Sequence, residues 1–164
     1  MLWPTSSSDG FVIAPARSRI ELTSAAALFR AYAKSLPIDL APQGFQQELA
    51  SLPGIYAPPE GELLLAKRGD HLLGCIALKA LEPPLIGEIK RLFVRPQARG
   101  QGVGKALVAA ILTTARERGY RQVKLDTLSH LKEAIALYTS FGFKPIPLYG
   151  NHPYPELVCL AAQL

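Results

Sequence analysis

The sequence has 164 residues, a formal net charge of +5, 49% hydrophobic residues and 19% charged residues. This length suits one domain with its own core, and the composition excludes a disordered chain. Apolar runs stay shorter than the ~18 residues of a membrane-spanning helix, and the first ten residues lack the pattern of a secretory signal. We expect a cytoplasmic protein with a loose tail at 1–10 and a single domain at 11–164.

Hydrophobic periodicity, interrupted by proline and glycine, predicts short alternating elements. Apolar residues at intervals of three and four indicate helices, and alternating or continuous short apolar runs indicate strands. In chain order we expect a strand at 11–16, helices at 20–36 and 42–52, strands at 62–67, 72–81 and 88–94, a helix from about 103, a strand at 121–126, a helix at 131–141, and strands at 143–146 and 156–162. This order predicts a mixed sheet covered by helices, not a regular doubly wound sheet.

The stretch from Glu88 to Leu107 joins a predicted strand to a predicted helix through a glycine-rich turn. Glycine lets the backbone approach a ligand closely, and the first amides of a helix lack intrahelical partners. Such a turn is suited to hold an anion, and phosphate is the expected group.

The glycine spacing excludes two common phosphate motifs. Gly100, Gly102 and Gly104 run G-x-G-x-G, so the dinucleotide fingerprint G-x-G-x-x-G fails at Lys105. A Walker loop needs glycine where Arg99 stands and Ser or Thr after the lysine, and neither is present. The remaining pattern, Arg99-x-x-Gly102-x-Gly104, resembles the pyrophosphate loop Q/R-x-x-G-x-G/A of the GCN5-related N-acetyltransferase (GNAT) family.

The resemblance extends in pattern over nearly the whole chain from Phe11, with specific residues between Glu88 and Phe143. It implies an α/β (α+β) fold with a mixed, mostly antiparallel central sheet of six to seven strands and about four flanking helices. It also implies acetyl-CoA as cosubstrate. The residues expected to bind it are Leu92, Phe93, Val94, Arg99, Gly100, Gln101, Gly102, Val103, Gly104 and Lys105.

Two contacts of this cofactor site are expected to involve the backbone and not side chains. In the family, the strand ending at Leu92, Phe93 and Val94 is bulged, and its backbone pairs with the pantetheine arm and polarises the acetyl carbonyl. No glycine or proline marks a bulge inside this strand. Leu131 stands where the family often has asparagine, so that contact is expected to shift to the backbone near Asp126 and Thr127.

Glu88 and Tyr138 are the expected catalytic residues. Glu88 resembles the glutamate base of the histone acetyltransferase branch, and an amine with a pKa near ~10 needs a base at neutral pH. The alternative is an exposed strand carboxylate paired with Lys90 or Arg91. Tyr138 lies in the Leu-Tyr-x-x-x-Gly-Phe motif at 137–143 and would protonate the leaving thiolate. Its alternative is a half-buried core tyrosine.

The acceptor site is the least defined part of the sequence. The resemblance implies that residues 31–59 and 147–155 shape it. Its candidate lining residues are Tyr32, Phe45, Glu48, Tyr56, Asn151, His152 and Tyr154, with a solvated helix face as the alternative for Glu48 and a plain loop residue as the alternative for His152.

The two cysteines and three histidines predict neither metal nor disulfide. Cys75 and Cys159 lie in apolar surroundings typical of buried free thiols, and the histidines lack metal-ligand spacing. Basic residues cluster around the predicted phosphate loop, so an anionic cofactor explains them without nucleic acid.

We therefore expect an acetyl-CoA-dependent N-acetyltransferase that acts by direct transfer. The expected partner is a small-molecule amine or amino acid; no nucleic acid, no membrane and no metal are expected, and a homodimer is left open. Three alternatives remain: transfer to a protein amine, a non-catalytic acyl-CoA sensor or partner-binding module, and nucleic-acid binding through the basic patch, which predicts salt-dependent affinity.

Overall fold

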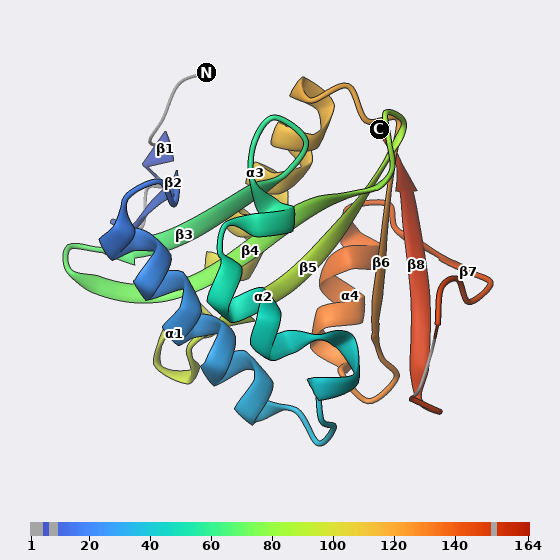
Figure 1. Ribbon diagram of the computed structural model, residues 1–164, viewed down its shortest axis with the longest axis horizontal. Coiled ribbons are helices and arrows are strands. Elements are labelled where there is room, and N and C mark those ends of the chain that lie inside the picture. The colour runs from blue at the N-terminus through green and yellow to red at the C-terminus, as the bar shows by residue number, and fades with distance from the viewer. Residues whose placement is uncertain (1–4, 7–9, 152–153) are drawn as a thin grey trace.

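The computed structural model describes residues 5–6, 10–151 and 154–164 of the chain. Its strands form one eight-stranded sheet in the order β1-β2-β3-β4-β5-β6-β8-β7 (Figure 1). The strands are β1 (Thr5–Ser6), β2 (Val12–Pro15), β3 (Glu62–Arg68), β4 (His71–Glu82), β5 (Ile86–Val94), β6 (Gln122–Leu128), β7 (Lys144–Ile146) and β8 (Leu157–Gln163). The helices are α1 (Arg19–Ser35), α2 (Phe45–Ser51), α3 (Val103–Glu117) and α4 (Lys132–Ser140), with short 3-10 helices η1 (Ala41–Gln43), η2 (Gly54–Tyr56) and η3 (Pro96–Ala98).

Local sequence signals explain where the long helices begin and end. Ser18 and Glu21 form a capping box at the start of α1, in which each side chain accepts a hydrogen bond from the other residue's backbone N–H. α1 ends at Ser35, shortly before Pro37, which cannot continue a helix. α3 is followed by Gly119, whose φ of +90° is the left-handed conformation that glycine adopts readily.

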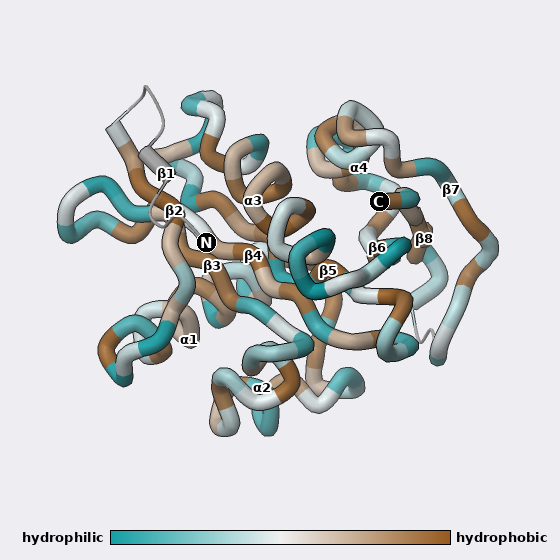
Figure 2. The backbone as a smooth tube through the Cα atoms, turned by 90° about the horizontal axis from the view of Figure 1, so that it is seen from above, coloured by the Kyte–Doolittle hydropathy of each residue, from teal (hydrophilic) through white to brown (hydrophobic). Residues whose placement is uncertain are grey.

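The helices cover the sheet on two sides, with a hydrophobic core on each. α1 and α2 lie on one face and α3 and α4 on the other, as the view along the sheet shows (Figure 2). Along the central strands, successive side chains point alternately into one core and the other. Leu63, Leu65, Cys75 and Ala77 pack with α1 and α2, whereas Leu64, Ala66, Ile76 and Leu78 pack with α3.

β5 and β6 are paired over only part of their length. Their parallel register runs from Ile86 opposite Gln122 to Glu88 opposite Lys124. Beyond these residues the two strands diverge, as Figure 1 shows below the point where they meet. The divergence opens the middle of the sheet at the end of β5 that leads into the glycine-rich turn.

β5 also contains a β-bulge. Cys75 is opposite Phe93 and Ala77 is opposite Lys90, so three steps along β5 match two along β4. Arg91 lies in this irregularity with φ of +62°, a conformation that is rare for a residue with a side chain. The resemblance implied a bulge here, and Arg91 forms it although no glycine or proline marks the position.

The expected fold class and element order are confirmed. Strands β2 to β8 form a mixed seven-stranded sheet with four α-helices, and β1 adds a two-residue edge strand. Thr5 and Ser6 lie in the segment expected to be a loose tail, but they pair with Ile13 and Val12. The predicted strands at 62–67 and 72–81 correspond to the antiparallel strands β3 and β4, which a tight turn joins.

Candidate active site

A groove of about 630 Å³ follows the C-terminal end of β5 and the N-terminus of α3. One wall consists of Leu92, Phe93 and Val94, and the floor is the glycine-rich turn. The opposite wall comes from the segment before α4 and its first turns, and Tyr32 and Leu36 contribute from α1. Nine of the ten predicted cofactor residues line this groove, and Gln101 does not; the nine are Leu92, Phe93, Val94, Arg99, Gly100, Gly102, Val103, Gly104 and Lys105.

The glycine-rich turn has the backbone geometry of an anion site. Gly100 and Gly102 have φ values of +77° and +80°, and Gly102 is the N-cap of α3. The first hydrogen bond of the helix runs from the Ala106 amide to the Gly102 carbonyl (3.0 Å), so the amides before Ala106 have no intrahelical acceptor. Together with the helix dipole they can hold a phosphate group.

Gly104 lies where α3 packs closely against Leu137 of α4. A Cβ atom at Gly104 would lie 3.3 Å from Leu137 Cδ2 and 3.7 Å from Val94 Cγ2. An alanine at this position would require the Leu137 side chain to shift by a few tenths of an ångström. The third glycine of the motif serves close helix approach, whereas Gly102 serves the turn itself.

Arg99 and Gln101 have local roles in this turn. Arg99 Nε donates to the Val94 carbonyl at 3.2 Å, and Gln101 Nε2 donates to the Gln97 carbonyl at 3.2 Å. Both bonds tie the turn to the preceding segment. Arg99 and Lys105 are exposed and line the groove, so their charges are available to an anionic ligand.

A second cavity, of about 50 Å³, lies where β5 and β6 diverge. It shares Tyr32, Leu92, Leu131 and Ala134 with the groove, so a ligand's extended arm in the groove would point toward it. Tyr138 lines this cavity together with Lys90, Arg91, Asp126 and Thr127. Asp126 and Thr127, the residues expected to replace the asparagine contact, are therefore at this position.

Tyr138 combines burial with a place in this cavity. Its ring packs edge to face on Phe143 with centroids 5.4 Å apart, and 5% of the residue is exposed. Burial, with smaller contributions from Tyr32 and Asp126, raises the pKa of Tyr138 well above its usual value. The hydroxyl therefore stays protonated at physiological pH, as a general acid must be. The ring belongs to the core and Tyr138 also lines the cavity, so its role as a general acid stays a prediction.

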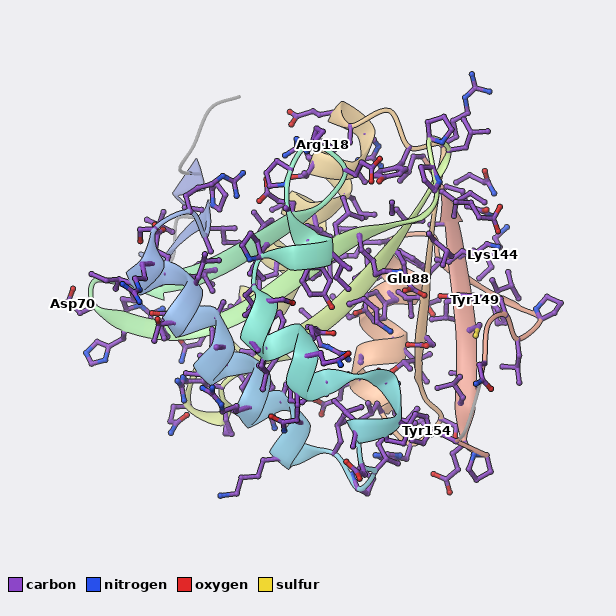
Figure 3. The ribbon with its side chains drawn as sticks, viewed as in Figure 1. Asp70, Glu88, Arg118, Lys144, Tyr149 and Tyr154 are labelled. Carbon is purple, nitrogen blue, oxygen red and sulfur yellow. The ribbon has the colours of Figure 1, made fainter. Side chains whose placement is uncertain are left out.

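Glu88 is buried, not exposed on the strand. Its residue is 5% exposed, and its Oε2 accepts a hydrogen bond of 2.6 Å from the Tyr149 hydroxyl (Figure 3). Lys79 Nζ and Lys90 Nζ lie 3.6 Å and 3.9 Å from its Oε1. The pairing with Lys90 is thus present, whereas Arg91 pairs with Glu48 instead.

Tyr149 is a site residue that sequence reasoning missed. Burial and the Glu88 carboxylate raise the pKa of Tyr149, so it stays a hydrogen-bond donor. Lys124 Nζ lies 5.2 Å from the centre of its ring. Tyr149 belongs to the segment 147–155 that was expected to shape the acceptor site, but proline-rich surroundings without periodicity offered no signal for this residue.

Asp126 is a second carboxylate near the cavity. Its Oδ1 lies 3.5 Å from Lys90 Nζ, and the same ammonium group lies 3.9 Å from Glu88. Asp126 lines both the 50 Å³ cavity and a neighbouring cavity of about 30 Å³. Lys90 therefore bridges the two carboxylates on the side of the sheet that faces α1 and α2.

The acceptor candidates fall into separate groups. Tyr32 lines all three cavities, and Tyr154 lines the 30 Å³ cavity and donates from its hydroxyl to the Asp39 carbonyl at 2.6 Å. Tyr56 is 1% exposed and packs edge to face on Phe29 in the core, so its assignment to the acceptor site is not supported. Glu48 and Phe45 surround Arg91, Asn151 is exposed, and His152 lies outside the described residues.

Cys75 and Cys159 are buried and unpaired. Burial raises the pKa of the Cys75 thiol to about 12, and its Sγ donates to the Arg91 carbonyl at 3.3 Å. In the part of the chain that the structure describes, no three His, Cys, Asp or Glu side chains are grouped to hold a metal ion. Each described helix is too short or too polar to cross a membrane.

Comparison with known proteins places this architecture in one family. Residues 25–143 match the acetyltransferase (GNAT) family. An uncharacterized N-acetyltransferase of Schizosaccharomyces pombe is 38% identical over 139 residues, which are 84% of this chain and 85% of that protein. The chain belongs to the GNAT family, and it is an N-acetyltransferase of the kind that uses acetyl-CoA.

Two solved structures illustrate the shared fold. An acetyltransferase from Streptococcus agalactiae has a TM-score of 0.77 and 22% identity, covering 94% of this chain and 99% of that chain. A GNAT family acetyltransferase from Elizabethkingia anophelis, solved with acetyl-CoA bound, has a TM-score of 0.66 and 22% identity, covering 96% of this chain and all of that chain. At these identities the likeness concerns the fold.

Proposed function

We propose that this enzyme transfers the acetyl group of acetyl-CoA directly to the primary amine of a small molecule or amino acid. The observation that carries the proposal is the continuity between the groove and the gap in the sheet. The phosphate-type turn lies at one end, Tyr138 lies at the other, and Glu88 and Asp126 lie nearby on the side of the sheet facing α1 and α2.

The groove fits an extended cofactor with a pyrophosphate. The amides of Val103, Gly104 and Lys105 and the dipole of α3 would hold the pyrophosphate, and Arg99 adds charge. The backbone of Leu92 to Val94 lines the groove beside the gap and would pair with the pantetheine arm. When bound, the thioester supplies the activated acetyl group.

Three groups of this chain would assist the transfer. Glu88, acting directly or through water, accepts the proton of the attacking amine, and the Tyr149 hydroxyl orients this carboxylate. The backbone N–H groups at the bulge of β5 polarise the acetyl carbonyl. Tyr138 donates its proton to the departing sulfur, which makes coenzyme A the second product.

Direct transfer is favoured over a covalent acyl-cysteine route. The thiolate is the nucleophilic form of cysteine, and burial keeps Cys75 protonated. Cys159 is also buried, and its burial raises the pKa of its thiol. Mass spectrometry of the protein incubated with acetyl-CoA alone should find no acetylated cysteine.

The size of the acceptor side supports a small acceptor. The two cavities beside the gap measure about 50 Å³ and 30 Å³, and Tyr149 covers Glu88. A protein amine would have to enter as an extended lysine or chain terminus through the same space. The chain's formal net charge of +5 suits an acceptor that also carries a carboxylate, as an amino acid does.

An acceptor panel tests the proposal. Thiol release from acetyl-CoA is followed with amino acids, polyamines, aryl and alkyl amines, and lysine-containing peptides. Turnover with a small amine supports the proposal, and turnover only with peptides assigns the protein-amine alternative. Tight binding of acetyl-CoA by calorimetry without turnover on any amine would identify a cofactor sensor instead.

A further inference from the structure

Arg91 has a backbone conformation that is unfavourable for a residue with a side chain. Its φ of +62° makes it the only non-glycine residue with positive φ in the described ranges. This left-handed conformation places Cβ close to the backbone and is unfavourable for a residue with a side chain. Such a conformation persists only where the surrounding structure holds it.

The side chain of Arg91 is held on all sides. Its Nε and Nη2 donate to the two carboxylate oxygens of Glu48, each at 2.9 Å, and the ion pair is 3% and 8% exposed at the two side chains. Gln43 Oε1 accepts two longer bonds of 3.4 Å. The guanidinium carbon lies 5.7 Å from the Tyr32 ring centre and 5.4 Å from that of Phe45.

These contacts keep Arg91 charged although it is buried. Burial is the largest single influence and lowers the pKa of Arg91, but the hydrogen bonds that Arg91 donates to Glu48, together with electrostatic attraction to Tyr56, Glu48 and Tyr32, outweigh it, and the net pKa is raised. The planar guanidinium matches both carboxylate oxygens, which a lysine ammonium cannot do. The ion pair therefore fixes the orientation of the Arg91 guanidinium as well as its distance from Glu48.

The backbone of Arg91 determines how the next residues of β5 face the groove. The register break lies between Lys90, opposite Ala77, and Phe93, opposite Cys75. The Arg91 carbonyl is itself held by the Cys75 thiol at 3.3 Å. Leu92, Phe93 and Val94, which follow directly, line the groove. A change in φ at Arg91 would therefore change the orientation of the backbone of Leu92 to Val94 along the groove.

We propose that Arg91 is a positioning residue, whose buried ion pair with Glu48 holds the bulge of β5 and thereby positions the backbone of Leu92 to Val94 so that the N–H groups on the side away from β4 polarise the acetyl carbonyl. The inference rests on the proposed transfer reaction. Because Glu48 belongs to α2, the ion pair also connects β5 to this helix. Donors aimed at the developing charge are effective only when held in place.

Two double variants separate the backbone effect from the loss of charge. Arg91→Gly with Glu48→Gln and Arg91→Ala with Glu48→Gln both remove the guanidinium and leave no unpaired carboxylate. Glycine adopts positive φ freely, whereas alanine does not. We expect the alanine variant to have kcat about tenfold below that of the glycine variant, with the KM of acetyl-CoA within about threefold, because the pyrophosphate turn is untouched.

A binding measurement provides a readout that needs no acceptor. Coenzyme A lacks the acetyl carbonyl, so the ratio of its Kd to that of acetyl-CoA reports contacts to this group. By calorimetry we expect the ratio to fall in the alanine variant and to fall less in the glycine variant. Equal kcat and equal ratios in the two variants and in the wild type would overturn the proposal.

The remaining outcomes are distinguishable. If the wild type acetylates no amine in the panel, the proposed function fails, while the Kd ratio still tests the role of Arg91. If the alanine double variant does not fold, Glu48→Gln alone weakens the same contact. Lower kcat at unchanged KM for acetyl-CoA in Glu48→Gln supports the proposal, and wild-type kcat contradicts it.

Discussion

Tyr138 lies in the cavity between β5 and β6, and its protonated hydroxyl suits the release of a thiolate. We predict that Tyr138→Phe lowers kcat by about a hundredfold, the lower end of what general acid catalysis contributes. The ring contacts with Phe143 are retained, so the Kd of acetyl-CoA should change by less than about twofold. Steady-state kinetics and calorimetry measure the two quantities.

Tyr120→Phe is a matched control for this variant. The Tyr120 hydroxyl donates to the Glu60 carbonyl at 2.8 Å, and Tyr120 lines none of the three cavities at the gap. It should reduce stability slightly and leave kcat unchanged. Unaltered turnover in Tyr138→Phe would show that Tyr138 serves only the core.

Glu88 is expected to act on the amine, and its effect should therefore depend on pH. At neutral pH an amine with a pKa near ~10 is mostly protonated and needs a base, whereas above that pH it is already free. We predict that Glu88→Gln lowers kcat/KM by about a hundredfold at pH 7 and that the loss shrinks as pH rises toward 10. A pH profile of both proteins measures this.

Asp126→Asn distinguishes Glu88 from the second carboxylate. Asp126 contacts the same lysine, Lys90, so both variants disturb the same cluster. Only the variant of the true base should show a loss that disappears with rising pH. A loss in Glu88→Gln that is constant across pH, with the pH-dependent loss in Asp126→Asn, would move the base to Asp126.

At the scale of elements, the turn between β5 and α3 is expected to bind the cofactor. Gly102 has φ of +80° and caps the helix whose first amides would hold the pyrophosphate. We predict that Gly102→Asp abolishes measurable binding of acetyl-CoA, because a carboxylate would occupy and repel the anion site. Circular dichroism should show a retained fold.

Gly119→Asp serves as the control at the other end of the same helix. Gly119 has φ of +90°, so aspartate is strained there in a similar way, and nothing lies within 4 Å of its added Cβ. This variant should lose stability but keep its affinity for acetyl-CoA. Unchanged cofactor affinity in Gly102→Asp would remove the turn from the binding site.

A buried carboxylate joins distant parts of the whole molecule. Glu62, at the start of β3, is fully buried and accepts bonds of 2.7 to 2.9 Å from Arg17, which precedes α1, and Arg118, which follows α3. The cluster thus connects both helical layers to the sheet. Removing Glu62 leaves Arg118, whose side chain is 17% exposed, without its carboxylate partner.

We predict that Glu62→Ala lowers the free energy of unfolding by about 2–3 kcal/mol, less than for a fully buried pair, because the Arg17 side chain is 47% exposed. Chemical denaturation measures the change, and the Kd of acetyl-CoA should be unaffected in the folded protein. The exposed pair of His130 and Glu156, 3.7 Å apart, is the control: Glu156→Gln should change stability by about 0–1 kcal/mol. Similar losses in both variants would contradict a special role for Glu62.

Local patterns were sufficient to predict most elements of this fold. The turn around Gly69 and the helix stop at Gly119 depend on neighbouring residues, and both formed between the elements that the sequence predicts. The capping box at Ser18 is equally local. The glycine-rich turn is equally local, because its conformation and its free amides follow from residues within one helical turn. The groove lined by Arg99 to Lys105 could therefore be located in advance.

Strand alternation could not predict the surroundings of Arg91. Strict alternation would place it on the same face as Ile89, in the core with α3, but the bulge turns it toward Glu48 and α2 instead. Glu48 was therefore weighed as an acceptor contact or a solvated residue, and Tyr56 was placed at the acceptor site although it is core. Ion pairs over more than 40 residues of chain leave no periodic signal.

The sequence alone determined three features: the glycine-rich turn, the motif around Tyr138, and the alternation of strands and helices. Short-range backbone preferences and burial patterns govern all three. The divergence of β5 from β6, the bulge at Arg91 and the contact of Tyr149 with Glu88 emerged only in the folded chain. They depend on the register between strands and on side chains brought together from α2 and the segment before β8. Such contacts are set by the packing of the whole sheet and not by neighbouring residues.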